Sequence, residues 1–162
     1  MMTAEQLPSL GGTQLHDMFA NAPAGDVPVG TGRGQALIAT GSRAARPLLA
    51  AVRYIAWRGK EFDDCSSTLL NILTPFSLRA VKADVYVDAS RLDGRPCIVL
   101  DYSKTSRVAG WVRDEIRQVA PGLYVGVVYV RSRRAPLMFS LEFETADRLW
   151  RTPSTVTSTL SS

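Results

Sequence analysis

An alternation of apolar and polar residues with a period of two runs through most of the chain after Trp57. It is clearest in AVKADVYVD, residues 80–88, where every second residue is apolar. Successive side chains of a strand point to opposite faces of a sheet, so this pattern predicts half-buried strands. The segments with strand character are 35–40, 57–62, 67–73, 79–88, 96–102, 114–119, 122–131 and 136–144.

Seven or eight short strands, mostly at hairpin spacing, predict an antiparallel meander that closes into a barrel. Asp93-Gly94 and Pro121-Gly122 are turn signals between successive strands. Residues 44–56 have helical spacing, so we expect a helix inserted after the first strand, packed across one end of the barrel. The rival fold is an α+β cone with helices inside one curved sheet. It fits less well, because the first strand precedes the main helix.

The rest of the chain suggests one folded unit with loose ends. Residues 1–12 are expected to form a flexible leader, followed by a short amphipathic helix over 13–20 with Thr13 as its N-cap. The glycines of NAPAGDVPVGTGRG are interpreted as turn residues before the first strand. Glycines that enter a strand mark a bulge or close packing more often than a phosphate-binding loop. Residues 13–146 are predicted to be a single β-barrel domain, and the Ser/Thr-rich residues 147–162 a disordered tail.

Composition excludes several function classes. The chain has one histidine and two cysteines without a C-x-x-C spacing, which argues against a zinc site or a Ser-His-Asp catalyst. The formal charge of +4 comes without a basic stripe interleaved with aromatic residues, so no nucleic-acid partner is expected. No apolar run approaches a membrane span. The sequence thus predicts a reduced, cytoplasmic protein without a cofactor, and its oligomeric state cannot be read.

Several short motifs resemble a known family. GTGRGQALIA, then WRGKEF, then CIVLDY, VRDEIRQVAPGLYVGVVYVR and PLMFSLEFE are similar to the small bacterial domains named for a GxWxG motif. The resemblance spans roughly residues 30–144, with Gly32 where the motif has tryptophan. It implies a lipocalin-like (calycin-like) barrel that binds a lipid or another apolar small molecule, and it supplies no catalytic residues. In such barrels the tryptophan closes the floor, so Trp57 or Trp111 would have to replace it.

Two candidate catalytic residues stand at the end of PCIVLDY, residues 96–102. Strand alternation places Asp101 and Tyr102 on opposite faces unless a bulge intervenes. One of them could lie at the cavity mouth as a general acid, a general base or an oxyanion donor. The favoured interpretation makes Asp101 a turn cap and Tyr102 a wall residue that bonds through its hydroxyl.

A second candidate is the charged row in WVRDEIRQV, residues 111–119. A strand would align Arg113, Glu115 and Arg117 on one face, and such charge is usually solvated or cross-paired. If the face were internal, the row would need a polar or anionic ligand group, and Arg113 and Glu115 would join the catalytic candidates. The aromatic residues proposed to line the ligand are Trp57, Tyr86, Trp111, Tyr124, Tyr129 and Phe139.

Three functions follow from these features. The first is binding of an apolar or amphipathic small molecule, lipid-like or polyketide-like, in the barrel cavity. The alternative is a cofactor-free cyclase or isomerase that acts on a natural-product-like substrate in the same barrel, by positioning it. The third, ranked last, is a partner-binding domain that uses Arg131, Arg133 and Arg134. Because no motif demands chemistry, binding is placed slightly ahead of catalysis.

Overall fold

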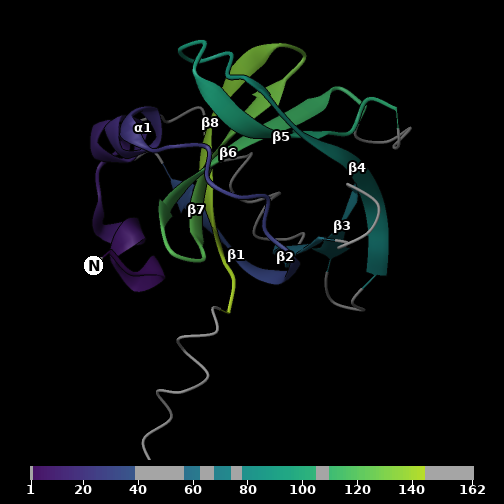
Figure 1. Ribbon diagram of the computed structural model, residues 1–162, viewed down its shortest axis with the longest axis horizontal. Coiled ribbons are helices and arrows are strands. Elements are labelled where there is room, and N and C mark those ends of the chain that lie inside the picture. The colour runs from purple at the N-terminus through teal and green to yellow at the C-terminus, as the bar shows by residue number, and fades with distance from the viewer. Residues whose placement is uncertain (1, 39–56, 63–67, 74–77, 105–109, 145–162) are drawn as a thin grey trace, which may run out of the picture.

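The computed structural model describes residues 2–38, 57–62, 68–73, 78–104 and 110–144. Two helices, η1 (Ala4–Ser9, a 3-10 helix) and α1 (Gly12–Asn21), precede the strands. The strands are β1 (Gly30–Ile38), β2 (Trp57–Phe62), β3 (Thr68–Leu73), β4 (Leu78–Ala89), β5 (Pro96–Asp101), β6 (Val112–Ala120), β7 (Leu123–Val130) and β8 (Arg133–Glu142). The predicted mainly β, antiparallel architecture is confirmed (Figure 1).

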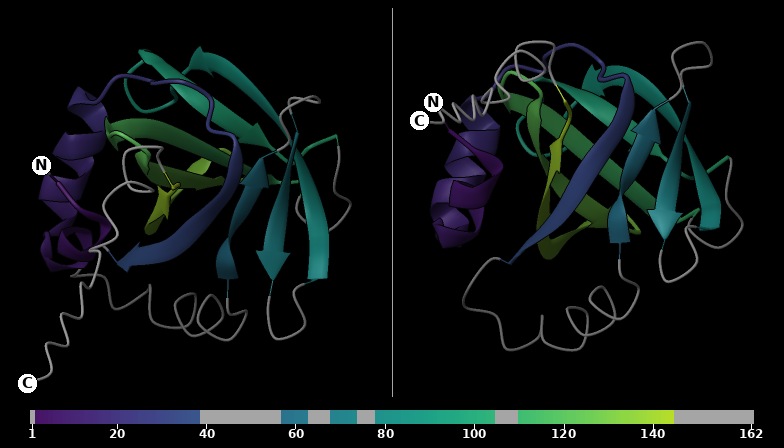
Figure 2. Two further views of the ribbon diagram at one scale, coloured as in Figure 1. Left: turned by 60° about the horizontal axis from the view of Figure 1, so that its bottom comes forward. Right: turned by 90° about the horizontal axis from the view of Figure 1, so that it is seen from below.

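Each strand pairs with the next one along the chain, and β1 also pairs with β8. In that last ladder Arg33 lies opposite Glu142 and Ile38 opposite Leu137. The strand order β1 to β8 therefore returns to its start as a closed barrel (Figure 2). Such closure leaves no exposed edge strand within the ladder.

Three sequence predictions need correction near the N-terminus. The expected leader is not flexible throughout, because residues 4–9 form η1 and Leu7 is fully buried. The helix after it is capped by Gly11 rather than Thr13. The glycines interpreted as turn residues belong to β1, which begins at Gly30 rather than at residue 35. The predicted helix over 44–56 and the tail 147–162 lie outside the described residues.

The inward-facing side chains form one apolar cluster. Its buried members come from β2, from every strand between β4 and β8, and from the residues just after β5 and β8. They are Phe62, Ala83, Val85, Ile98, Leu100, Tyr102, Ile116, Tyr124, Phe139, Leu141 and Phe143. Because these residues share one parity along each strand, they define the inner face of the barrel.

A second apolar cluster lies on the outer face, where η1 and α1 pack against β1, β6, β7 and β8 (Figure 2). Leu7, Leu15 and Phe19 of the helical segment meet Val125 and Val127 of β7 there. This helical cover explains why β7 is apolar on both faces, a pattern that a strand with one wet face would not show.

Two inward-facing glycines accommodate aromatic rings. A Cβ atom on Gly32 would lie 2.5 Å from Cζ of Phe143, and one on Gly126 would lie 2.3 Å from Cζ of Phe139. Phe143 also makes edge-to-face contacts with Phe62 and Tyr124, with ring centroids 5.4 and 5.7 Å apart. The space beside Gly32 is thus filled by a phenyl ring from the residues after β8.

Residues 22–29 carry the chain from α1 past the ends of β6 and β7 into β1. The backbone N–H of Gln118 donates to the carbonyl oxygen of Pro23 at 3.1 Å. The hydroxyl of Tyr124 donates to the carbonyl oxygen of Asp26 at 2.7 Å. Because Gln118 and Tyr124 share the inner parity, this segment covers the inner face at that end of the barrel.

Candidate functional site

The strand register divides the predicted site residues between the two faces of the barrel. Tyr102, Tyr124 and Phe139 belong to the inner cluster. The other described candidates lie on or beside the outer face, and they are Tyr86, Asp101, Trp111, Arg113, Glu115 and Tyr129. Trp57 lies in β2, and its side chain is outside the described part of the structure. The candidates therefore do not form a single site.

The described side chains of the inner face include a polar pair close to the β5–β6 end. The hydroxyl of Tyr102 donates to Oδ2 of Asp114 at 3.3 Å, and both side chains are buried. Asp114 was not among the predicted site residues, because it stands between Arg113 and Glu115 in a charged run. Its alternation with Ile116 was the available signal, since it places an acid on the same face of the strand as that apolar residue.

Tyr124 places a second hydroxyl on the inner face, at the opposite end. Burial raises its pKa to about 12, and the Asp26 carboxylate adds to that shift. The phenol therefore stays neutral at physiological pH and serves as a hydrogen-bond donor to the backbone of Asp26.

Glu115 is 0% exposed on the outer face, beneath the β4–β5 connection. Its carboxylate accepts hydrogen bonds from the Ser90 hydroxyl at 2.6 Å and from the backbone N–H of Arg91 at 3.0 and 3.2 Å. Nε of Arg113 donates to the same carboxylate at 3.0 Å. Glu115 is thus enclosed by its partners, and this arrangement anchors the connection to β6.

Arg117 is also fully buried outside the barrel, between the β4–β5 connection and α1. Its guanidinium binds the Asp93 carboxylate and the carbonyl oxygens of Phe19 and Ala20 at the end of α1, and it lies 4.7 Å from the ring centroid of Phe19. The charged row Arg113, Glu115 and Arg117 therefore lies on one face of β6, and its members are paired with opposite charges, as the favoured interpretation of the sequence predicts. The internal alternative is wrong, because the inner parity of β6 belongs to Asp114 and Ile116.

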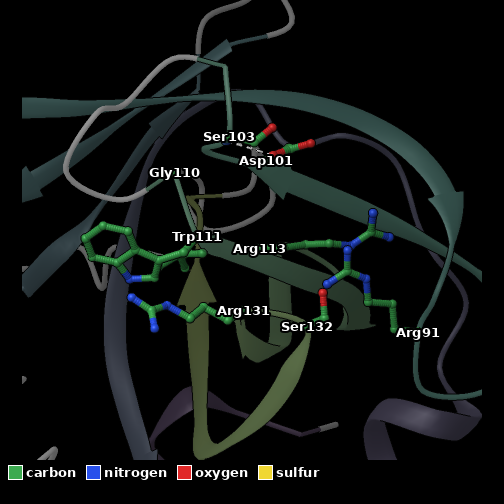
Figure 3. Close-up of a pocket in the computed structure, with 9 residues that line it drawn as sticks. Arg91, Asp101, Ser103, Gly110, Trp111, Arg113, Arg131 and Ser132 are labelled. Carbon is green, nitrogen blue, oxygen red and sulfur yellow. Dashed lines mark hydrogen bonds between the residues drawn. The ribbon is translucent and has the colours of Figure 1, made fainter.

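A groove of about 200 Å³ opens on the outer side, beside the β5–β6 connection and the β7–β8 turn. The residues that line it include Arg91, Asp101, Ser103, Trp111, Arg113, Arg131 and Ser132 (Figure 3). In Figure 3 the Trp111 indole lies near Arg131, whereas Arg91 and Arg113 approach each other near Ser132. Three arginines and one carboxylate therefore line this groove, and of the arginines Arg113 is already paired with Glu115.

Asp101 supplies the carboxylate of the groove. It accepts hydrogen bonds from the Tyr86 hydroxyl at 3.0 Å and from the backbone N–H of Ser103 at 2.8 Å. Burial alone would raise the pKa of Asp101, but the hydrogen bonds from Ser103 and Tyr86 outweigh it and lower that pKa. Asp101 is therefore an ionised turn residue at neutral pH, in keeping with the favoured interpretation.

Among the described residues, no group of three or more His, Cys, Asp or Glu side chains is arranged to hold a metal ion. Cys97 is a free, buried thiol whose pKa burial raises to about 12, with a smaller contribution from Glu115. Within the same ranges, no helix combines the length and the apolar character that crossing a membrane requires.

No protein-family model matches the chain, and no curated protein matches it significantly. A solved structure of a protein from Thermomonospora curvata is similar, with a TM-score of 0.61 and 20% sequence identity. The likeness covers 88% of this chain and 95% of that one. At this identity it establishes a shared fold alone.

Proposed function

We propose that the protein is a lipocalin-like barrel that binds an apolar small molecule inside the strand ladder. The observation that carries the proposal is the inner cluster of buried apolar side chains, whose members come from β2 and from every strand from β4 to β8. Binding sites for small molecules are mostly apolar and contain a few placed polar groups. Tyr102 and Asp114 supply such groups here.

The ligand is proposed to lie toward the β5–β6 end. At the other end the rings of Phe62, Tyr124 and Phe143 pack together, and residues 22–29 cover them. An eight-stranded barrel is wide enough to hold one small ligand where side chains do not fill it. Leu100, Ile116 and Tyr102 would then contact the ligand, and the Tyr102 hydroxyl would fix its orientation.

The test has two arms. Purified protein is extracted with organic solvent for mass spectrometry, and the extracted protein is titrated with the uncharged fluorescent probe N-phenyl-1-naphthylamine. We expect a co-purified apolar species and saturable probe binding that this species displaces. Leu100→Trp, which fills the inner face, should weaken probe binding about tenfold. Val29→Trp is the matched control, because Val29 is 55% exposed. Absence of both a bound species and saturable binding would overturn the proposal.

The Tyr102–Asp114 pair favours one second candidate, a cofactor-free cyclase or isomerase. The Tyr102 phenol could donate a proton to one position of a bound substrate while the Asp114 carboxylate removes a proton from another position. The proton on Asp114 then returns to Tyr102 through their hydrogen bond, so that the pair ends as it began. Incubating the protein with its extracted ligand should then form a product of unchanged mass and altered retention time. Tyr102→Phe should abolish this conversion while leaving binding within about threefold. Unchanged conversion in that variant would exclude the role.

A further inference from the structure

The outer groove carries positive charge that the described carboxylates do not neutralise. Arg113 is bound to Glu115 at 3.0 Å and lies 3.8 Å from Asp88. Among the described residues, neither Arg91 nor Arg131 forms an ion pair. We propose that this groove binds a small oxyanion attached to a flat ring, at a site separate from the barrel interior.

The two arginines are held so that their donors remain available. Backbone bonding to Glu115 fixes the main chain of Arg91, and its guanidinium lies 5.7 Å from the Tyr129 ring centroid. The backbone N–H of Arg131 donates to the carbonyl oxygen of Trp111 at 2.8 Å, which fixes the β7–β8 turn against the groove. Guanidinium groups bind carboxylates and phosphates through paired N–H donors, so they suit an oxyanion.

The β7–β8 turn contains two residues whose backbone conformation is unfavourable for their side chains. Arg131 and Ser132 have φ values of 48° and 66°, and both are non-glycine residues in the left-handed region. Two-residue hairpin turns of this kind favour Asn-Gly, because positive φ is strained for most side chains. Both strained residues line the groove, so their side chains offer a reason for retaining the strain.

The ring component is inferred from Trp111 and from the size of the groove. Trp111 is 49% exposed, although large aromatic side chains gain by burial, and its indole lines the groove. The groove of about 200 Å³ is smaller than the usual site for a drug-sized ligand, so one ring with one anionic group is the expected size. The Asp101 carboxylate lines the same groove and disfavours ligands with more than one anionic group.

The experiment uses the full chain labelled with nitrogen-15, and phenyl phosphate and benzoate as separate probes. The readout is the indole N–H signal of Trp111, assigned by its loss in Trp111→Phe. At least one probe should shift this signal saturably, and inorganic phosphate and benzyl alcohol should each bind about tenfold more weakly. The probe that binds identifies the oxyanion as phosphate or carboxylate.

Variants test the assignment of the two arginines. Arg91→Gln and Arg131→Gln should each weaken binding about tenfold. Arg33→Gln is the matched control, because the Arg33 side chain is 82% exposed and lies outside the groove. The double variant Arg131→Asn/Ser132→Gly installs the favoured turn sequence, so it should raise the melting temperature and still weaken binding.

When the double variant melts at a higher temperature than the wild type, its loss of binding cannot result from misfolding. The proposal is overturned if neither probe shifts the Trp111 signal saturably at millimolar concentration. It is also overturned if the double variant, or both Arg91→Gln and Arg131→Gln, bind the probe as tightly as the wild type does. A loss of affinity in Arg33→Gln equal to that in the groove variants would overturn it as well. Binding inside the barrel is measured separately with the uncharged probe N-phenyl-1-naphthylamine. The proposed ligand site inside the barrel and the proposed oxyanion site in the groove can therefore fail independently.

Discussion

Nη1 of Arg117 donates to Oδ2 of Asp93 at 2.7 Å, and Nη2 donates to Oδ1 at 2.6 Å. The same guanidinium donates to carbonyl oxygens of Phe19, Ala20, Arg95 and Pro96. This bidentate pair joins the β4–β5 connection, β6 and the end of α1 through one side chain. A fully hydrogen-bonded buried charge of this kind depends strongly on its partner.

Replacing the carboxylate in Asp93→Asn should therefore destabilise the fold by about 3 kcal/mol, because it leaves the buried Arg117 charge without a counter-ion. The measurement is the midpoint of urea unfolding at pH 7. Asp17→Asn is the control, since the Asp17 side chain is 67% exposed, and it should change stability by less than about 0.5 kcal/mol. Equal effects of the two substitutions would contradict the proposed dependence on the pair.

The Asp93 pair also predicts a pH dependence. The hydrogen bonds from Arg117 lower the pKa of Asp93 from 3.8 to about 2. A carboxyl group with a lowered folded-state pKa stabilises the fold above its unfolded-state pKa, and this contribution is lost as pH falls through the folded-state value. Stability should thus decline between about pH 4 and pH 2 in the wild type, and less so in Asp93→Asn. Urea midpoints of both proteins at half-unit steps of pH would measure this difference. Parallel curves of midpoint against pH for the wild type and Asp93→Asn would contradict the prediction.

Tyr129 offers a substitution expected to leave stability unchanged or to improve it. Its hydroxyl is buried and has no hydrogen-bond partner among the described residues. Removing an unsatisfied buried hydroxyl removes its desolvation cost, so Tyr129→Phe should change the free energy of unfolding by between zero and about +1 kcal/mol. Thermal unfolding measures this, with Tyr124→Phe as the contrast, because the Tyr124 hydroxyl is bonded to Asp26. A clear loss of stability in Tyr129→Phe would reveal a partner of the hydroxyl.

Glu115 should prove a structural residue. Glu115→Gln replaces one carboxylate oxygen by an NH2 group, which cannot accept a hydrogen bond. The variant therefore loses either the bond from Ser90 or the bond from Arg113, and it also loses the negative charge, so we expect a loss of about 2–4 kcal/mol. Affinity for the uncharged probe should be unchanged in the folded fraction, because Glu115 lies outside the barrel. Circular dichroism melts and probe titration test this together. A selective loss of probe affinity without destabilisation would contradict this structural role and make Glu115 a residue of the ligand site.

Gly32 is expected to be intolerant even of alanine. The added Cβ would lie 2.5 Å from the Phe143 ring, and overpacking of this kind costs about 1–3 kcal/mol. Phe143→Leu shortens the opposing side chain, so the double variant Gly32→Ala/Phe143→Leu should be destabilised by less than the sum of the two single variants. Urea unfolding of all four proteins forms the cycle. Additive effects would show that the two residues do not compete for the same space.

The strand positions were largely readable from the sequence, because alternation at a period of two survives wherever one face is buried. The side of the barrel that a polar residue faces was also readable in principle, since Asp114 shares its parity with Ile116. The pairing of Asp114 with Tyr102 could not be predicted, because it depends on the register between neighbouring strands, which the alternation pattern does not give. The glycines of β1 were placed before the strand because glycine is typical of turns, whereas the close packing expected of glycines that enter a strand is confirmed at Gly32, where the Phe143 ring lies.

The outer site residues were harder to predict for a physical reason. The β4–β5 connection contributes Ser90 and Arg91 to the environment of Glu115, and the β7–β8 turn brings Arg131 to Trp111. These contacts join segments distant in sequence, and no periodicity records them. The burial of Arg117 could not be predicted for the same reason, because the Arg117 guanidinium is covered only when helix α1 packs against the barrel.

The pairing of β1 with β8 differs in kind from every other ladder in the barrel. All other ladders join strands that follow each other along the chain, so each forms by closing a comparatively short loop. Joining β1 to β8 requires the first and the last strand of the barrel to meet, and such non-local contacts are slow to form. We therefore expect β1 to join late in folding, bringing η1 and α1 with it. Destabilising changes in this seam should mainly accelerate unfolding and leave the refolding rate nearly unchanged.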